Sequence, residues 1–259
     1  QIAGVNVAEQ GQLLTADPNL HSPAITGLPD IWRQTLDQAA GWSVDLVDKQ
    51  DRPAEQLAHV MPADTTPIRT TLDTRLQLLA QHAVATDPRP TVLVAIAPST
   101  GGILAAAQND AATAQGPIAF TGLYPPGSTF KTITTAAALA KGIATPDTPE
   151  PCPGSVTVEN RTIPNEDEFD LGTVPLAQAF AHSCNTTMGA LADKLPADAL
   201  PNTAKNLGIG VDFVIPGITT VTGKVPNADT PAQRVENGIG QGTVTVSPFG
   251  LAVAEASLA

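Results

Sequence analysis

A serine and a lysine three residues apart carry the strongest chemical signal in the sequence. They are Ser128 and Lys131, in the run Tyr-Pro-Pro-Gly-Ser-Thr-Phe-Lys, and residues 132–140 after them favour a helix. Residues at i and i+3 share a helix face, so the hydroxyl and the amine should lie close together. A serine becomes a strong nucleophile when a base takes its proton, and a lysine can be that base when burial lowers its pKa. The pattern therefore predicts a serine acyl-enzyme, with free N–H groups at the helix start favouring a developing anion.

The same spacing also has a purely structural explanation. Serine at a helix start is commonly an N-cap, and a lysine one turn later is commonly a solvated charge. The motif alone leaves both explanations open, and the rest of the chain must decide between them.

A second polar stretch follows about 55 residues later, in the form Ser-x-Asn. Its members are Ser183 and Asn185. A second hydroxyl can carry a proton between a catalytic lysine and a leaving-group nitrogen, and the asparagine amide offers both a donor and an acceptor to a substrate amide. Taken alone, such a tripeptide is more often a cap or a turn.

Composition sets the outer limits. The chain has 259 residues, 42% of them hydrophobic, so a sizeable core is expected in one or two domains. A net charge of −12 argues against a nucleic-acid partner, which requires a basic surface. No run of about 18 apolar residues is present, so no segment is expected to span a bilayer. The two cysteines have no spacing to histidines that suggests zinc.

Three elements should place the Ser128 helix. Residues 73–86 predict an amphipathic helix capped by Asp73. The apolar runs 91–97 and 103–107, separated by a short Gly-rich loop, predict a hairpin buried on both faces. The order helix, hairpin, helix implies a sheet covered by helices on both sides. The residues expected on the buried face of the 73–86 helix are Leu76, Leu79, Ala80 and Ala83.

Residues 1–67 predict a smaller N-terminal region joined through a linker at 62–67. A helix over 28–39 with Asp30 as N-cap and a strand over 42–47 are expected, followed by a polar turn. The remainder of this region is expected to be irregular apart from one possible extended piece. That piece covers residues 5–14.

The C-terminal half alternates loops with helices. Residues 145–174, rich in Pro, Asp and Glu, predict loops, and their acidic cluster is expected to be solvated. Helices are expected from 174, again over 188–194, and over 245–258 with a cap near Ser247. The glycine-rich stretch 238–242 lacks the Lys-Ser/Thr of a phosphate-binding loop, so nucleotide binding is not expected.

In its ordered set of motifs the chain resembles the class B penicillin-binding proteins, which are monofunctional D,D-transpeptidases. The match runs from about residue 68 to the end. The sequence pattern is similar to that of the lipoprotein branch, which contains methicillin-resistance-type enzymes. The high content of Ala, Thr and Pro would suit an actinobacterium. The helix after Gly27-Leu28 and the strand at Gly41-Trp42 resemble the family's pedestal region more loosely. The Glu that usually follows Gly-Leu in the family is Pro29 in this sequence. The motifs are Thr70-Thr-Leu-Asp73 with Gln77, Ala97 to Ala105, Tyr124 to Lys131, Ala181 to Thr186, and Ile239 to Gly242 with Val246-Ser-Pro248.

The resemblance implies an α+β fold of the penicilloyl-serine transferase, or serine β-lactamase-like, type. Residues 1–67 would be the pedestal or dimerisation-type region and 68–259 the transpeptidase domain. Ser128 would be acylated, its backbone N–H forming part of the oxyanion hole, and Lys131 would accept the proton. Ser183 would relay protons and Asn185 would hold the donor peptide.

The resemblance also implies partners and a location. The donor would be a stem peptide ending in D-Ala-D-Ala, with β-lactams as mimics, and cell-wall synthesis proteins would be further partners. No cofactor, metal or nucleic acid is expected. The protein would work outside the cytoplasm, attached to the cell membrane by an anchor that this sequence does not contain.

One family motif is absent. The Lys-Thr-Gly sequence of this class is not found, and Lys224, followed by Val-Pro, does not replace it. The motif and the last strands of the sheet are expected beyond Ala259, which would leave the strand at 91–97 with an open edge.

Two other functions stay open at this point. A serine β-lactamase would need a group that activates a deacylating water; Glu166 is a candidate by type, but it lies in an acidic loop without the pattern of those enzymes. A sensor or scaffold would bind without turning over. The lifetime of a covalent adduct separates these functions.

A disulfide between Cys152 and Cys184 is a further hypothesis. An extracytoplasmic enzyme works in an oxidising space, and both cysteines flank the same connection. Two unpaired buried thiols are the alternative.

Overall fold

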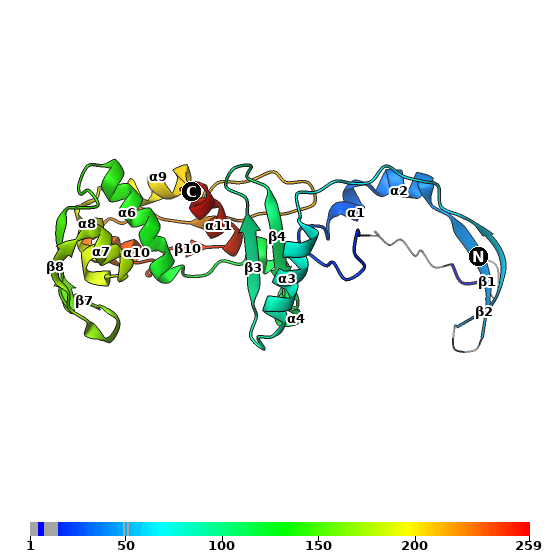
Figure 1. The fold of residues 1–259 in the computed structure, drawn as a ribbon, viewed down its shortest axis with the longest axis horizontal. Helices are drawn as coiled ribbons and strands as arrows, with labels where there is room; N and C mark the ends of the chain where they lie inside the picture. Colours follow the sequence, from blue (N-terminus) through cyan, green and yellow to red (C-terminus); the bar gives the residue numbers. More distant parts are fainter. Residues whose placement is uncertain (1–4, 8–14, 49, 51) are drawn as a thin grey trace.

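The computed structural model describes residues 5–7, 15–48, 50 and 52–259. The molecule is elongated, with an N-terminal β-ribbon at one end, the β3–β4 hairpin in the middle and a mainly helical part at the other end (Figure 1). None of the helices in the described residues combines the length and the apolar composition that a bilayer-spanning segment requires.

The N-terminal part consists of two short helices and a two-stranded antiparallel ribbon. They are α1 (Leu28–Ile31), α2 (Arg33–Ala39), β1 (Trp42–Val47) and β2 (Pro53–Val60). The expected strand at 42–47 is confirmed as β1. The partner strand β2 falls in residues that the sequence assigned to a turn and irregular chain, so that assignment is wrong.

The helix expected over 28–39 is interrupted. Trp32 has φ −97° and ψ 12°, which separates α1 from α2. Asp30 is not an N-cap, because Pro29 occupies the first turn of a helix that already begins at Leu28. Asp30 instead pairs with Arg33 at 2.6 Å. Most of the extended piece expected over 5–14 lies outside the described residues.

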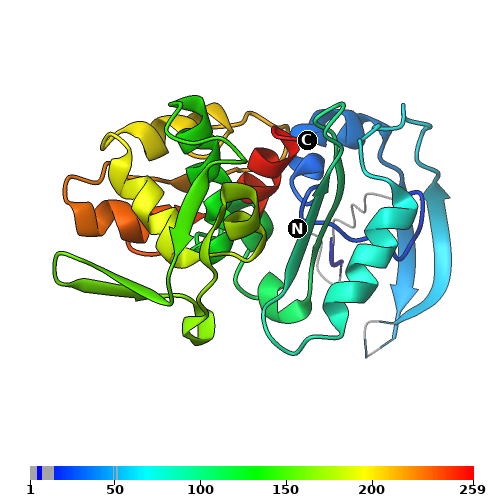
Figure 2. The same ribbon diagram turned by 60° about the vertical axis from the view of Figure 1, so that its left-hand side comes forward.

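The central hairpin is covered on both faces, as expected. β3 (Val92–Ile96) pairs antiparallel with β4 (Ile103–Gln108). Alternate β3 residues face α11 (Pro248–Ala256) on one side and α3 (Thr74–Ala85) on the other. Figure 2 shows α3 lying along this hairpin. In the described part of the chain, β3 hydrogen-bonds to β4 alone.

The buried face of α3 differs from the expected one. Asp73 caps the helix, accepting from Leu76 N at 2.8 Å, but Leu76 and Leu79 are 41% and 55% exposed. The buried residues are Gln77, Ala80 and Val84. The Gln77 amide accepts from Ala106 N at 2.8 Å and donates to Ala106 O at 2.9 Å, thereby covering the free edge of β4. These two bonds to the β4 backbone place Gln77, and not Leu76 or Leu79, against the hairpin.

The part that follows the hairpin is mainly helical, and its α6 and α8 share a core. Phe130, Ile133, Ala137 and Ala192 are fully buried there. Its helices are α4 (Asp110–Thr113), α5 (Ile118–Thr121), the 3₁₀ turn η1 (Gly127–Phe130), α6 (Lys131–Ala140), α7 (Leu176–Ala181), α8 (Asn185–Lys194), α9 (Ala199–Asn206) and α10 (Pro231–Gly238).

Residues 145–174 are not only loops, contrary to the sequence-based expectation. They include β5 (Pro149–Cys152), β6 (Ser155–Val158), β7 (Arg161–Pro164) and the turn η2 (Glu166–Glu168), followed by β8 (Gly172–Pro175). β5 pairs with β8, and β6 with β7. Each of these strands has only four residues and is stabilised by its pairing partner. A last short pair joins β9 (Gly223–Lys224) to β10 (Thr245–Val246).

The final helix is α11, which begins at Pro248 and not at residue 245 as expected. Ser247 caps it by accepting from Gly250 N at 2.9 Å, and Pro248 occupies its first turn. Phe249 packs on Phe120 with ring centroids 5.4 Å apart.

Candidate active site

The Ser-x-x-Lys motif spans a 3₁₀ turn and the start of a helix. Ser128 is exposed in η1, and Lys131 is the first residue of α6. Phe130, between them, is fully buried and anchors the turn to the core. The turn thus presents a serine to solvent and directs the lysine inward.

A glycine-to-glycine contact supports this turn from behind. Gly127 N donates to Gly240 O at 2.9 Å. Gly240 has φ +72°, and a Cβ there would collide with the Gly127 carbonyl. Gly240 therefore positions the serine turn through a close backbone contact that a side chain would prevent.

Lys131 is buried and makes three hydrogen bonds. Its side chain is almost inaccessible, with the residue 2% exposed. Nζ donates to Ser183 O at 2.6 Å, Ser183 Oγ at 2.8 Å and Asn185 Oδ1 at 2.5 Å. Burial lowers the pKa of Lys131 to about 8 from an ordinary 10.5. The amine is therefore neutral in a useful fraction of molecules near neutral pH.

These three partners differ in what they can do with a proton. Carbonyl oxygens only accept, whereas a hydroxyl both accepts and donates. Among the three, only Ser183 Oγ can return a proton to neutral Lys131. Ser128 Oγ makes no hydrogen bond within the described residues. The hydrogen bond from Ser128 to Lys131 or Ser183 that the spacing predicted is therefore not formed in this structure, whereas the expected one between Lys131 and Ser183 is present.

Ser183 lies in the link between α7 and α8. Its φ is +56°, in the left-handed region that non-glycine residues seldom adopt. Ser183 N donates to Phe180 O at 2.8 Å and Cys184 N to Ala179 O at 2.9 Å, so the end of α7 holds the strained residue in place. Both its carbonyl and its hydroxyl reach Lys131 as a result.

Asn185 is the first residue of α8, and its amide orientation is determined. Oδ1 accepts from Lys131, while Nδ2 donates to Pro164 O at 2.8 Å. A protonated lysine can only donate and a carbonyl can only accept, so the flipped amide would lose both bonds. The second Nδ2 hydrogen has no partner in the described part of the chain and is free for a substrate carbonyl.

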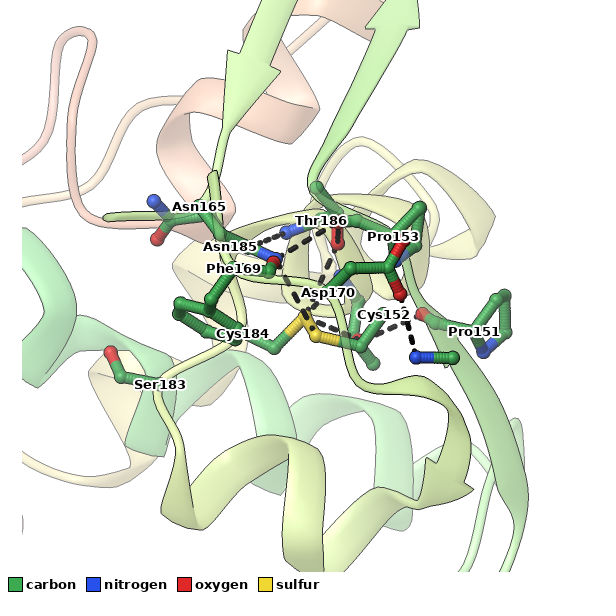
Figure 3. Close-up of a disulfide and its surroundings, with 12 residues drawn as sticks. Pro151, Cys152, Pro153, Asn165, Phe169, Asp170, Ser183, Cys184, Asn185 and Thr186 are labelled. Atoms are coloured by element: carbon green, nitrogen blue, oxygen red, sulfur yellow. Dashed lines mark hydrogen bonds between the residues drawn. A yellow bond between two sulfur atoms is a disulfide. The ribbon is translucent and has the colours of Figure 1, made fainter. Parts of the chain in front are cut away.

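A disulfide lies directly behind Ser183 and Asn185. Cys152 and Cys184 are joined with a Cα–Cα separation of 6.2 Å, and both are fully buried (Figure 3). The bond connects the end of β5 to the N-cap residue of α8. It ties the residue between Ser183 and Asn185 to the neighbouring hairpin region.

The structure thus brings Lys131, Ser183 and Asn185 together, with exposed Ser128 one turn from the lysine. Glu166 is exposed in η2. Within the described residues no three His, Cys, Asp or Glu side chains gather as a metal site. No sequence pattern pointed to the Pro164 carbonyl that orients Asn185, because Pro164 lies in an acidic stretch interpreted as a loop.

Comparisons with known proteins agree with this geometry. Residues 91–259, more than half of the chain, match the family model of the penicillin-binding protein transpeptidase domain. The peptidoglycan D,D-transpeptidase PbpA of Mycobacterium tuberculosis is 32% identical over 206 residues, 67% of this chain and 39% of that protein. Its Mycolicibacterium smegmatis counterpart is 33% identical over 74% of this chain and 46% of that protein. The chain therefore spans less than half of these curated relatives.

A solved structure shows the same fold. The penicillin G acyl-enzyme complex of penicillin-binding protein A from M. tuberculosis superposes with a TM-score of 0.69, at 28% identity, covering 76% of this chain and 53% of that one. Together with the matched family model, this places the chain in the penicillin-binding protein transpeptidase family.

Proposed function

We propose that the protein is a peptidoglycan D,D-transpeptidase that works through an acyl-enzyme on Ser128. One observation carries the proposal: the buried amine of Lys131 contacts the Ser183 hydroxyl and the Asn185 amide, one turn from an exposed serine. The curated relatives are named peptidoglycan D,D-transpeptidase, and the solved neighbour is a penicillin G acyl-enzyme.

In the proposed acylation step, Ser128 Oγ attacks the carbonyl of the penultimate D-Ala while neutral Lys131 takes its proton. The backbone N–H of Ser128 contributes to the stabilisation of the oxyanion. The proton then passes from Lys131 through Ser183 Oγ to the leaving D-Ala nitrogen. Free D-Ala departs, and the ester on Ser128 remains.

The second step reverses the proton path. An acceptor amine attacks the ester, gives its proton through Ser183 to Lys131, and Ser128 recovers its own proton as the peptide product leaves. The free Nδ2 hydrogen of Asn185 would hold the donor backbone in both steps. A β-lactam would enter the first step and block the second.

We extend the proposal to organisation and location. Residues 1–67 would form a pedestal and 68–259 the catalytic domain, which agrees with the β1–β2 ribbon lying at the opposite end from α6 (Figure 1). The substrate implies action on the cell wall outside the cytoplasm, where a disulfide persists. Cell-wall synthesis proteins would be its partners, and an anchor would attach it to the cell membrane.

The test uses a donor peptide ending in D-Ala-D-Ala and a labelled D-amino acid as acceptor amine. Wild-type protein should release D-Ala and incorporate the label, and Ser128→Ala should do neither. The penicillin adduct should persist for hours. Release within seconds would identify a β-lactamase, and an adduct without any incorporation would identify a sensor.

A further inference from the structure

A buried asparagine that makes no hydrogen bond to Ser128 or Lys131 in the described structure joins the segments around the site. Asn165 is 3% exposed and follows β7. Its Nδ2 donates to Pro153 O at 2.9 Å and to Phe169 O at 2.8 Å, and its Oδ1 accepts from Thr186 N at 3.2 Å. One side chain thus connects the turn after β5, the chain after η2 and the first turn of α8 (Figure 3).

These bonds hold Asn185 from two sides. Pro164, whose carbonyl accepts from Asn185 Nδ2, is the residue just before Asn165. Thr186, whose N–H binds Asn165 Oδ1, is the residue just after Asn185. Pro164, which binds the Asn185 side chain, is therefore joined to Asn165 by a peptide bond. Asn185 itself is joined by a peptide bond to Thr186, which Asn165 binds.

A second set of bonds shows that the connection is built rather than incidental. Thr186 Oγ1 donates to Pro153 O at 2.9 Å, the same carbonyl that Asn165 uses. The backbone N of Asn165 donates to Gly154 O at 2.9 Å. The backbone N–H of Asn165 and both ends of its side-chain amide therefore bind neighbouring chain segments.

We propose that Asn165 is a positioning residue for acyl transfer, acting through Asn185 on the orientation of Lys131 and Ser183. The inference rests on the proposed function. Without Asn165, the Pro164 carbonyl loses its fixed direction, so the Asn185 amide can rotate away from Lys131 Nζ. Noncovalent binding of a β-lactam should change less than acylation, because binding involves one hydrogen bond from Asn185 Nδ2, whereas acylation also requires Lys131 and Ser183 to be correctly oriented.

The test measures single-turnover acylation by penicillin in the full-length protein, separating the acylation rate constant from the dissociation constant of the initial complex. Asn165→Ala should lower the rate constant about 10- to 100-fold, since small displacements of catalytic groups can cost about 10²-fold. The dissociation constant should stay within about threefold of wild type.

Asn109 provides a matched control. It is also buried, its Oδ1 accepts from Thr91 N and Ala112 N, and its Nδ2 donates to Asp87 O and Arg89 O. It caps α4, beside α3 and away from α8 (Figure 1). Asn109→Ala should lower stability while leaving both constants of the folded protein unchanged. An equal fall in its acylation rate constant would show that lost stability, not positioning, explains the effect.

A double variant separates positioning from general damage. In an Asn185→Ala background, Asn165→Ala should cost less than about threefold more, because residues acting as a unit are not additive. An undiminished cost there, or wild-type acylation by Asn165→Ala, would overturn the inference alone. If Asn165→Ala does not fold, Asn165→Asp keeps the shape but cannot donate to Pro153 O or Phe169 O, and wild-type acylation by it would equally overturn the inference. A wild-type protein that forms no adduct would overturn the proposed function as well.

Discussion

The rate of acylation by penicillin is expected to rise with pH between 6 and 9. Lys131 can accept the Ser128 proton only when its amine is neutral. Because burial lowers the pKa of Lys131 to about 8, the neutral form becomes common within this range.

The expected magnitude follows from that value. With a pKa of about 8, roughly 1% of the amine is neutral at pH 6, about 9% at pH 7 and about 90% at pH 9. Acylation should therefore be about tenfold faster at pH 9 than at pH 7, then level off. A lysine with the ordinary pKa of 10.5 would be about 0.03% neutral at pH 7, so burial raises the reactive fraction about 300-fold.

The assay is stopped-flow acylation at limiting penicillin, which reports the free enzyme, with spontaneous penicillin hydrolysis measured at each pH. Lys131→Arg serves as the comparison, because a guanidinium stays protonated throughout. A flat profile in the wild type, or one still rising in proportion to hydroxide at pH 9, would show that neutral Lys131 is not the base.

Three further outcomes follow from the structure. In thermal or denaturant unfolding, the free energy of unfolding of the wild type should rise with pH between 8 and 10.5 relative to Lys131→Met, by up to about 3 kcal/mol. In this range the unfolded chain keeps the Lys131 proton that the folded chain has released. Equal pH profiles of the two proteins would refute the lowered pKa. Replacing both Cys152 and Cys184 by serine should cost about 3–4 kcal/mol in the chain-entropy model for a separation of 32 residues, and an unchanged denaturation midpoint would contradict it. Gly240→Ala should slow acylation by displacing the Gly127 carbonyl, while Gly142→Ala, also at positive φ but with open space around it, should cost stability only; equal acylation by both would refute the role of that contact.

Local signals predicted the parts of the fold that local chemistry determines. Asp73 and Ser247 cap α3 and α11 because a carboxylate or hydroxyl before an apolar run satisfies free N–H groups. The β3–β4 hairpin was visible because both strands are continuous apolar runs around a Gly-rich loop. The burial of Lys131 was expected only because the proposed acyl-enzyme chemistry requires it, and the structure confirms it.

Features that depend on distant partners were not predictable. β5 and β8 pair across about 20 residues, and neither strand has the length or alternation that would reveal it. The orientation of α3 depends on Gln77 reaching the backbone of β4, which no helical periodicity contains. Asn165 falls in the same class, because its three partners come from different segments.

The most direct test of the account is to locate the penicillin adduct. Full-length protein is incubated with penicillin, digested, and its peptides are sequenced by mass spectrometry, with Ser128→Ala treated in parallel. A single penicilloyl group on Ser128, absent from the variant, is the predicted result. An adduct on Ser183 or any other residue, or one retained by Ser128→Ala, would contradict the assignment of the nucleophile.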